Sequence, residues 1–314
     1  MKYRVVTAVL CAVALSASLW GAELEIAQRE IEVQGKYLLV PVSKTITPCA
    51  FRGNDKAMQQ QLDVFVDGVL VHSPSVDLAQ REGDISFWGQ LDMSKYIGKT
   101  ARLRVHVLNE KAKNAVPADS TSKALAMIDT GDQPRGNDPL YKESLRPQLR
   151  FSQMRGWNND SNGMLYYDGE YHLFWQANPV GLAHANMYWG HAVSTDLLHW
   201  TELPEALRPF AQNEKNIHPA IAIGHCHSGG GAVDLGNTGG WQPGKDEVLL
   251  LTFTDTGKKT GRQRDLPGYT ESRASSPDSG RTWTIWEGTP SNRHVGREPK
   301  LYRYESYSNT HLRA

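Results

Sequence analysis

Short runs of alternating apolar and polar residues, separated by turn residues, fill the first third of the chain. They are Ile31 to Val33, Tyr37 to Val42, Leu62 to Val66, Val69 to Ser73, Ile85 to Leu91 and Ala101 to Val107. A period of two is typical of half-buried antiparallel strands. The clearest signal is Asp67-Gly68 between two β-branched runs, because a two-residue hairpin turn favours this pair. Residues 23–109 are therefore expected to form a β-sandwich-like module.

The alternation stops at residue 110, and Lys, Asn, Asp, Pro, Ser and Gly dominate from there. We expect residues 110–145 to be a linker. Its short apolar run, Ala124 to Ile128, either forms one helical turn or docks on a neighbour.

From residue 146 the strand pattern returns as an internal repeat. The first unit has strands at Tyr171 to Gln176 and Tyr188 to Ser194, then Asp196, a turn, and Trp200-Thr201. The second has Val248 to Phe253 and Tyr269 to Ser276, then Asp278, a turn, and Trp283-Thr284; Arg297 to Tyr302 resembles the opening of a third. Repeated four-strand units of this kind indicate a β-propeller. Two units and a fragment leave strand edges unpaired, so we expect residues 146–314 to be an incomplete propeller and the chain to be truncated.

The first 22 residues have the pattern of a secretory signal peptide. Lys2 and Arg4 precede the apolar run Val5 to Leu15, and small residues follow. We therefore expect a secreted or periplasmic protein, with cleavage between Ser18 and Ala22 and no membrane span in the remainder. The cysteines left after cleavage, Cys49 and Cys226, are expected to be buried, unpaired thiols.

Composition narrows the choice of partner. Lys+Arg and Asp+Glu cancel at 34 each, so no long-range field favours nucleic acid or an anionic membrane surface. Nine Trp and twelve Tyr supply flat aromatic surfaces, which suit sugar rings as well as core packing. A neutral carbohydrate fits this composition.

The stretch Gly156 to Gly163 concentrates the candidate chemistry. It places the carboxylate of Asp160 among amide side chains, with Trp157 before it. Taken alone, Asp160 in such a polar stretch is typical of a turn. Its surroundings change that interpretation.

Several motifs, in this order, resemble glycoside hydrolase family 32. They are Arg146-Pro147 with Phe151, Gly156 to Gly163, Tyr171 to Pro179, Trp189 to Ser194, and Asp196 through His199-Trp200. The resemblance, which runs from about Arg146 to Tyr302, implies an all-β fold in which the sandwich-like module precedes the first blades of a five-bladed β-propeller. The family contains invertases, inulinases and levanases.

The resemblance also assigns roles to residues. Asp160 matches the family's nucleophile, which attacks the anomeric carbon of fructose while a second carboxylate acts as acid and then base. Asn159 and Gln176 match amides that bind sugar hydroxyls, Trp157 lies beside the sugar pocket, and Ser228 belongs to a channel-strand Ser-Gly pair. Such chemistry implies no cofactor.

Some positions depart from the family pattern. Arg297-Glu298-Pro299 stands where the family has Arg-Asp-Pro, so Glu298 is a longer version of the transition-state stabiliser, and Arg297 keeps its donors for hydroxyl binding. Ser161, His184 and His227 replace a proline, a stacking tryptophan and a phenylalanine. The Glu-Cys pair that supplies the family's acid/base is absent from the 314 residues.

His225 and His227 raise the alternative of a metal site, since residues two apart on a strand share a face. Only His218 offers itself as a third ligand, and we expect no metal site.

Three functional hypotheses follow. The leading one is a secreted exo-acting fructan β-fructosidase, for levan or inulin. An invertase cleaving sucrose is the close alternative, and a non-catalytic fructan-binding or degenerate protein is the rival. Without the proton donor, we expect the 314-residue chain itself to have little or no activity. The sandwich-like module either binds sugar through Trp88 or Tyr96 or serves as a structural appendage.

Overall fold

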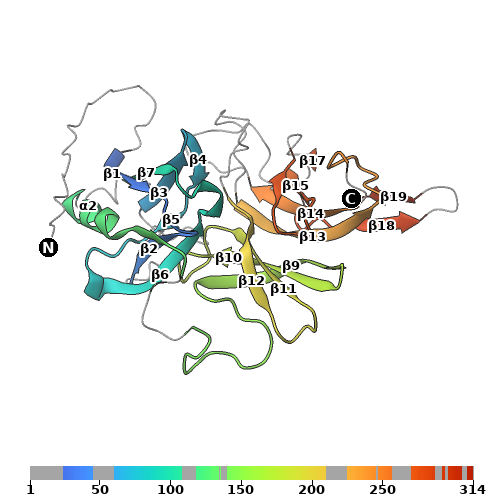
Figure 1. Cartoon of the computed structure of the whole chain (residues 1–314), viewed down its shortest axis with the longest axis horizontal. Helices are drawn as coiled ribbons and strands as arrows, with labels where there is room; N and C mark the ends of the chain where they lie inside the picture. The colour runs from blue at the N-terminus through green and yellow to red at the C-terminus, as the bar shows by residue number, and fades with distance from the viewer. Residues whose placement is uncertain are drawn as a thin grey trace.

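A computed structural model of the chain describes residues 24–44, 60–107, 118–133, 135, 140–209, 225–244, 247–256, 270–286, 292–293, 296–305 and 310–313. The expected signal peptide and Cys49 lie outside these residues. The described part is nearly all β, as expected, and contains a single α-helix of ten residues. A sandwich of two sheets stands beside two propeller blades (Figure 1).

The sandwich is formed by strands that the alternating pattern predicts. One sheet has the order β1-β7-β3-β4 with β5 paired to β3, and the other has the order β6-β2-β8. The bounds are β1 Leu24–Glu32, β2 Tyr37–Ser43, β3 Gln60–Val66, β4 Val69–His72, β5 Ser75–Val76, β6 Ile85–Asp92, β7 Thr100–Val107 and β8 Asp129–Gly131. Short 3-10 turns occupy Glu82–Asp84 and Ser94–Tyr96. Asp67 and Gly68 both have positive φ, so the predicted two-residue hairpin between β3 and β4 is present.

Part of the expected linker is ordered structure that belongs to the sandwich. Helix α2, Ala118–Met127, packs on β1, where Arg29 donates to the carbonyls of Leu125 and Ile128 at 2.8 and 2.7 Å. Strand β8 then pairs with β2. The apolar run Ala124 to Ile128 therefore docks on the sandwich, which is one of the two expectations for it. Leu125 and Ile128 bury their side chains in this contact.

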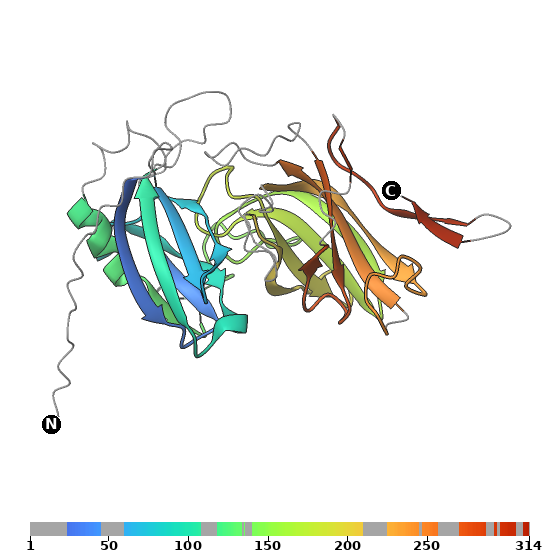
Figure 2. The same cartoon turned by 90° about the horizontal axis from the view of Figure 1, so that it is seen from above.

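Each blade is an antiparallel four-stranded sheet. The first has the order β12-β11-β10-β9, from β9 Trp157–Tyr167, β10 Glu170–Asn178, β11 Tyr188–Ser194 and β12 Thr201–Leu207. The second has the order β13-β14-β15-β16 with β17 paired to β15, from β13 His225–Leu235, β14 Glu247–Thr256, β15 Thr270–Ser276, β16 Thr284–Ile285 and β17 Asn292–Arg293. A hairpin of β18 Tyr302–Glu305 and β19 Thr310–Arg313 follows. Figure 2 shows the blades side by side, with this hairpin at the far end.

The repeat found in the sequence has a structural counterpart in both blades. Ser194 and Ser276 each donate to the aspartate two residues later, at 3.1 and 2.8 Å. The indole that opens the fourth strand caps the same turn each time: Trp200 donates to Leu197 at 3.1 Å and Trp283 to Gly280 at 3.0 Å. The repeat is therefore a blade unit, stabilised by the same local bonds.

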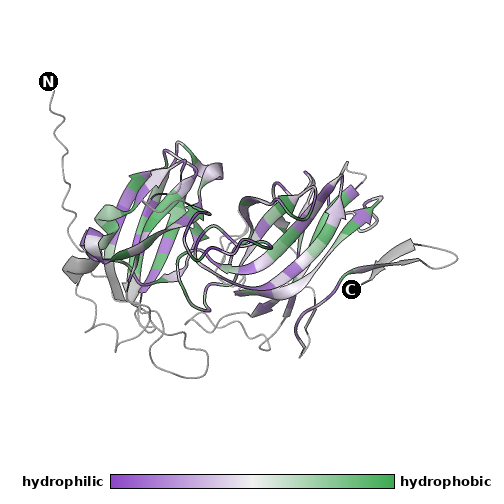
Figure 3. Cartoon of the chain, turned by 90° about the horizontal axis from the view of Figure 1, so that it is seen from below, coloured by the Kyte–Doolittle hydropathy of each residue, from purple (hydrophilic) through white to green (hydrophobic). Residues whose placement is uncertain are grey.

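The sandwich and the first blade share one hydrophobic core, which includes Trp175 and Tyr188 of the blade. Figure 3 shows the apolar bands that run along the strands of both parts. A buried ion pair joins them, with Arg208 Nη2 at 2.5 Å from Asp92 Oδ2. Asn186 adds bonds of 2.8 and 2.7 Å to the backbone of Ser75. The sandwich thus packs on the blade as a structural partner.

The two aromatics considered as sugar platforms both contact other protein groups. The guanidinium of Arg135 lies 4.4 Å from the ring centre of Trp88, and Tyr96 packs against the shared core. Cys226 is a buried free thiol, as expected. No helix in the described part of the chain is long and apolar enough to cross a bilayer.

Candidate active site

A chain of hydrogen bonds joins the two blades at Asp160. Gln176 Nε2 donates to Ser228 Oγ at 3.1 Å, and Ser228 Oγ donates to Asp160 Oδ2 at 3.0 Å. Gln176 and Ser228 are buried, whereas Asp160 is exposed. The structure therefore presents one anchored carboxylate to solvent.

Strand β9 carries Asp160, so the residue does not lie in a turn, as the polar sequence alone indicated. Residues Asn158 to Ser161 are exposed along this strand, and Asn159 is among them. Next to them Asn162 is buried, and its Oδ1 accepts the Gly229 amide at 3.4 Å. Pairing with β10 is irregular at this point, because Ala177 pairs with Asn158 and Trp175 with Ser161, so Asn159 and Asp160 lie at a bulge opposite Gln176.

Glycine allows the two carrier strands to meet. A Cβ added at Gly231 of β13 would lie 2.6 Å from the carbonyl oxygen of Gly163 of β9. Gly163 itself has φ +55 and is packed by Trp189 and Phe174. Because neither position tolerates a side chain, the backbones approach closely, and Ser228 reaches Asp160.

His227 lies close enough to Asp160, Arg297 and His184 to interact electrostatically with all three. The rings of Trp157 and His184 meet edge to face, with centroids 5.2 Å apart. Burial lowers the pKa of His227 to about 4, with Arg297 and His184 adding to the effect and Asp160 opposing it. His227 is therefore neutral at neutral pH. It acts on the pocket as an uncharged hydrogen-bonding group.

Arg297 and Glu298 lie in the segment that precedes β18. Both side chains are exposed, and Arg297 Nη2 lies 3.4 Å from Glu298 Oε1. The Glu298 backbone has φ 67, and its amide donates to Thr254 Oγ1 at 2.9 Å. Sequence reasoning missed Thr254, since a strand threonine 44 residues away carries no signal of this contact.

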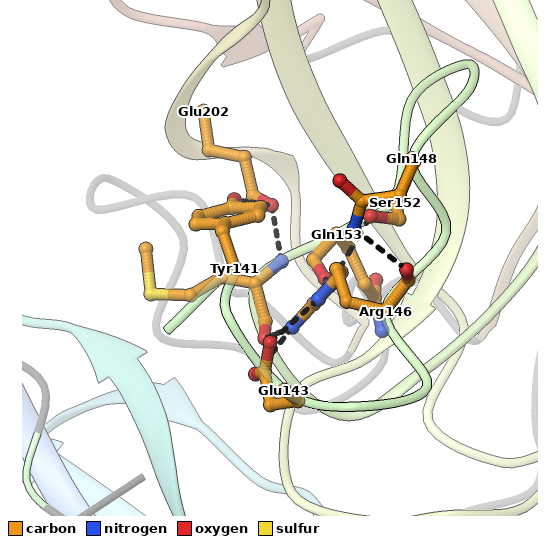
Figure 4. Close-up of polar contacts among 8 residues, drawn as sticks. Tyr141, Glu143, Arg146, Gln148, Ser152, Gln153 and Glu202 are labelled. Carbon is orange, nitrogen blue, oxygen red and sulfur yellow. Dashed lines mark hydrogen bonds and ion pairs between the residues drawn. The ribbon is translucent and has the colours of Figure 1, made fainter. Parts of the chain in front are cut away.

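The segment before β9 is fixed by Arg146 (Figure 4). Its guanidinium donates to Ser152 Oγ at 3.2 Å and to the carbonyls of Gln153 and Met154 at 2.6 and 3.0 Å. Its bonds to Glu143 hold the pKa of that carboxyl at about 2. This network orders the chain as it enters the strand that carries Asp160.

The two histidines of β13 considered as metal ligands make other contacts in the structure. His225 Nδ1 accepts the Met187 amide at 3.2 Å, and the rings of His225 and His227 meet edge to face at 5.9 Å. No group of three metal-ligating side chains occurs among the described residues, and His218 lies outside them.

Part of the chain is similar to known proteins. Residues 151–306 match the model of the Glycosyl hydrolases family 32 N-terminal domain. The levanase of Bacillus subtilis (strain 168) is 43% identical over 170 residues, covering 52% of this chain and 22% of the levanase. The extracellular exo-inulinase of Aspergillus awamori is 36% identical over 174 residues, covering 52% of this chain and 30% of the inulinase.

The crystal structure of the Aspergillus awamori exo-inulinase is similar at a TM-score of 0.45 and 30% identity, covering 55% of this chain and 35% of that one. The chain thus spans less than a third of the length of these two curated relatives. Through residues 151–306, it belongs to glycoside hydrolase family 32.

Proposed function

We propose that residues 146–314 carry the nucleophile side of a fructan β-fructosidase that releases fructose from levan or inulin. One observation carries the proposal: the solvent-facing carboxylate of Asp160 is anchored by Ser228 of the neighbouring blade. The similar levanase and exo-inulinase support the substrate class. The bond from Ser228 positions the Asp160 carboxylate between the two blades.

The proposed chemistry is a double displacement. Asp160 attacks the anomeric carbon of a terminal fructosyl unit, the bond to the leaving oxygen breaks, and a covalent fructosyl-enzyme forms. Water then releases fructose with retention. Trp157, Asn159, Gln176 and Arg297 bind the sugar in this proposal, and Glu298 stabilises the transition state from a longer side chain.

The leaving oxygen needs a proton, and general acid catalysis is typically worth about 10²- to 10⁴-fold. Because the 314 residues contain no Glu-Cys dipeptide, we propose that this chain by itself binds fructans and hydrolyses them slowly or not at all. A sucrose-cleaving invertase is the second candidate, since Asp160 chemistry serves either substrate.

Parallel assays separate these functions. Fructose release from levan, inulin and sucrose is measured for the purified chain and for Asp160→Asn, with calorimetry of fructo-oligosaccharide binding beside it. The proposal predicts binding, with any residual release strongest on levan or inulin and abolished in Asp160→Asn. Release that survives Asp160→Asn would refute the nucleophile, and release strongest on sucrose would favour the invertase.

We also propose that the protein is exported. The basic start, apolar run and small-residue exit of residues 1–22 support this, as does the extracellular exo-inulinase among its relatives. N-terminal sequencing of protein recovered outside the cytoplasm tests it, because a mature chain beginning after Ala22 or nearby is expected and an intact Met1 contradicts it.

A further inference from the structure

A cavity lies where the sandwich meets the first blade. Its volume is about 90 Å³. The sandwich contributes Tyr37 and Gln90, the segment before β9 contributes Gln153, and the blade contributes Trp175 and Glu205, among others. None of the residues proposed to bind fructose at Asp160 lines it.

Strand alternation keeps the two sites apart. Trp175 and Ala177 of β10 line the cavity, whereas Gln176 between them bonds to Ser228 on the Asp160 side. Successive side chains of a strand point to opposite faces of the sheet. One strand therefore serves both sites from opposite faces.

Buried polar atoms without a partner gather around this cavity. Gln90 Nε2, Gln153 Nε2, Arg155 Nε and Glu205 Oε2 accept or donate no hydrogen bond within the described part of the chain. Gln153 is only 8% exposed. Its Oε1 accepts the Trp175 indole N–H at 2.7 Å, which fixes the amide and leaves its N–H groups unused.

An irregular register delivers the carboxylates. Trp189 and His191 are two residues apart on β11, yet they pair with Leu207 and Leu203, four apart on β12. Such a bulge re-aims side chains, and both Glu202 and Glu205 line the cavity. Glu202 is already engaged, accepting the Tyr141 hydroxyl at 2.8 Å and the Met154 amide. Glu205 Oε2 has no hydrogen-bond partner among the described residues.

These groups define the chemistry of a ligand. The amides and the guanidinium N–H need acceptors. Burial raises the pKa of Glu205 to about 7, so its Oε2 accepts a hydrogen bond when ionised and can donate one when protonated. Hydroxyl groups both donate and accept, so a neutral hydroxylated molecule matches these groups. A water needs roughly 10–15 Å³, so a cavity of about 90 Å³ has room for about six to nine non-hydrogen atoms, which is enough for a three-carbon polyol.

We propose that this cavity binds a small polyhydroxylated ligand through Gln90, Gln153 and Glu205, independently of the Asp160 site. The ligand is either an acyclic polyol or a sugar that inserts one hydroxyl-bearing edge. The indole of Trp175 and the rings of Pro179 and Pro204 give its carbon skeleton apolar contact.

Ligand-observed NMR titrations with glycerol and, separately, with fructose test this site. Gln90→Leu removes the unpaired donor at similar volume, so the chain should fold at least as well. Gln148→Leu is the control, because Gln148 is exposed and lies outside the cavity. Gln90→Met replaces Gln90→Leu if the latter does not fold.

The proposal predicts saturable binding by the parent chain and Gln148→Leu that is about tenfold weaker in Gln90→Leu. Glycerol binding alone identifies an acyclic polyol, and fructose binding that falls in Gln90→Leu identifies a sugar. The proposal is overturned, leaving a cavity filled by water, if neither ligand binds saturably or if Gln90→Leu weakens the binding of neither glycerol nor fructose. Gln90→Leu should leave fructose binding at Asp160 unchanged. The experiment therefore tests the cavity separately from the Asp160 site.

Discussion

Ser228 donates its hydroxyl proton to Asp160 at 3.0 Å, although the two residues are 68 positions apart and belong to different blades. Because Ser228 Oγ accepts from Gln176 at 3.1 Å, its one proton is left for the carboxylate. A charge-assisted bond of this kind is among the stronger ones in proteins. Packing of the two blades therefore sets the position of the proposed nucleophile.

Ser228→Ala should slow attack by Asp160. The expected effect comes from lost positioning, because a reacting group misplaced by about 1 Å can cost about a hundredfold in rate. The measurement is covalent fructosylation by β-fructosyl fluoride, whose fluoride leaves without being protonated. Ser161→Ala, an exposed neighbour of Asp160, should react at the parent rate. Equal rates in Ser228→Ala would mean that the bond does not position the nucleophile.

Glu298→Asp should increase the fructosylation rate by about tenfold or more, since a carboxylate misplaced by 1 Å can cost about a hundredfold. The backbone at this position also favours the change, because φ 67 is tolerated better by aspartate than by glutamate. Glu298→Gln keeps the length and removes the charge, so it should give no gain. A slower Glu298→Asp chain would show that the longer side chain is adapted to its place.

Gly231→Ala should destabilise the protein by about 1–3 kcal/mol, because its Cβ would stand 2.6 Å from the Gly163 carbonyl oxygen. Separation of β9 and β13 should also slow fructosylation. Gly83→Ala is the control, since nothing lies within 4 Å of a Cβ added there. Denaturant unfolding measures both variants, and an unchanged Gly231→Ala would contradict close contact between the blades.

A buried pair of histidines predicts loss of stability in acid. His172 Nδ1 and His191 Nε2 lie 3.0 Å apart, and both side chains are 1% exposed. Burial lowers the pKa of both imidazoles below the usual 6.5, and that of His191 well below it. The unfolded chain therefore takes up protons below about pH 6.5 that the folded chain refuses. The stability from this pair is complete above pH 6.5 and is lost as the pH falls towards the folded pKa values.

Free energies of unfolding measured at pH 7 and pH 5 test whether stability falls as the pH falls. The double variant His172→Leu with His191→Leu replaces both partners by apolar groups, so its stability should fall less between these pH values than that of the parent. His199→Gln removes an exposed imidazole whose pKa is raised by Asp196, so this control should show a decline at least as steep as that of the parent. A decline that is equally steep in the double variant would exclude the pair as its source.

Local signals predicted much of this fold. The alternating pattern predicted strands β2, β6 and β7, and Asp67-Gly68 predicted the hairpin between β3 and β4. The repeated Ser-x-Asp turn predicted the blade unit. Strand β9 was harder, because residues 157–162 are mostly polar and show no period. Its extended form comes from pairing with β10, which a local pattern does not contain.

The candidate active site likewise contains residues that the sequence indicated and contacts that the sequence did not indicate. Family resemblance pointed to Asp160, Gln176 and Ser228, and the structure places them in one hydrogen-bonded chain. The Thr254 contact with Glu298 and the docking of α2 on β1 depend on residues distant in sequence. Contacts of this kind arise only from the packing of strands and sheets.

The identity of the modified residue after treatment with β-fructosyl fluoride tests the central claim most directly. The carboxylate attacks the anomeric carbon, the carbon–fluorine bond breaks, and fluoride leaves with its electron pair, so no acid catalyst is required. Peptide mass spectrometry should find one fructosyl group on Asp160 in the parent chain and in Asp168→Asn, whose substitution lies in the following turn. Asp160→Asn should carry none. A fructosyl group on another carboxylate, or equal labelling of Asp160→Asn, would contradict Asp160 as the nucleophile.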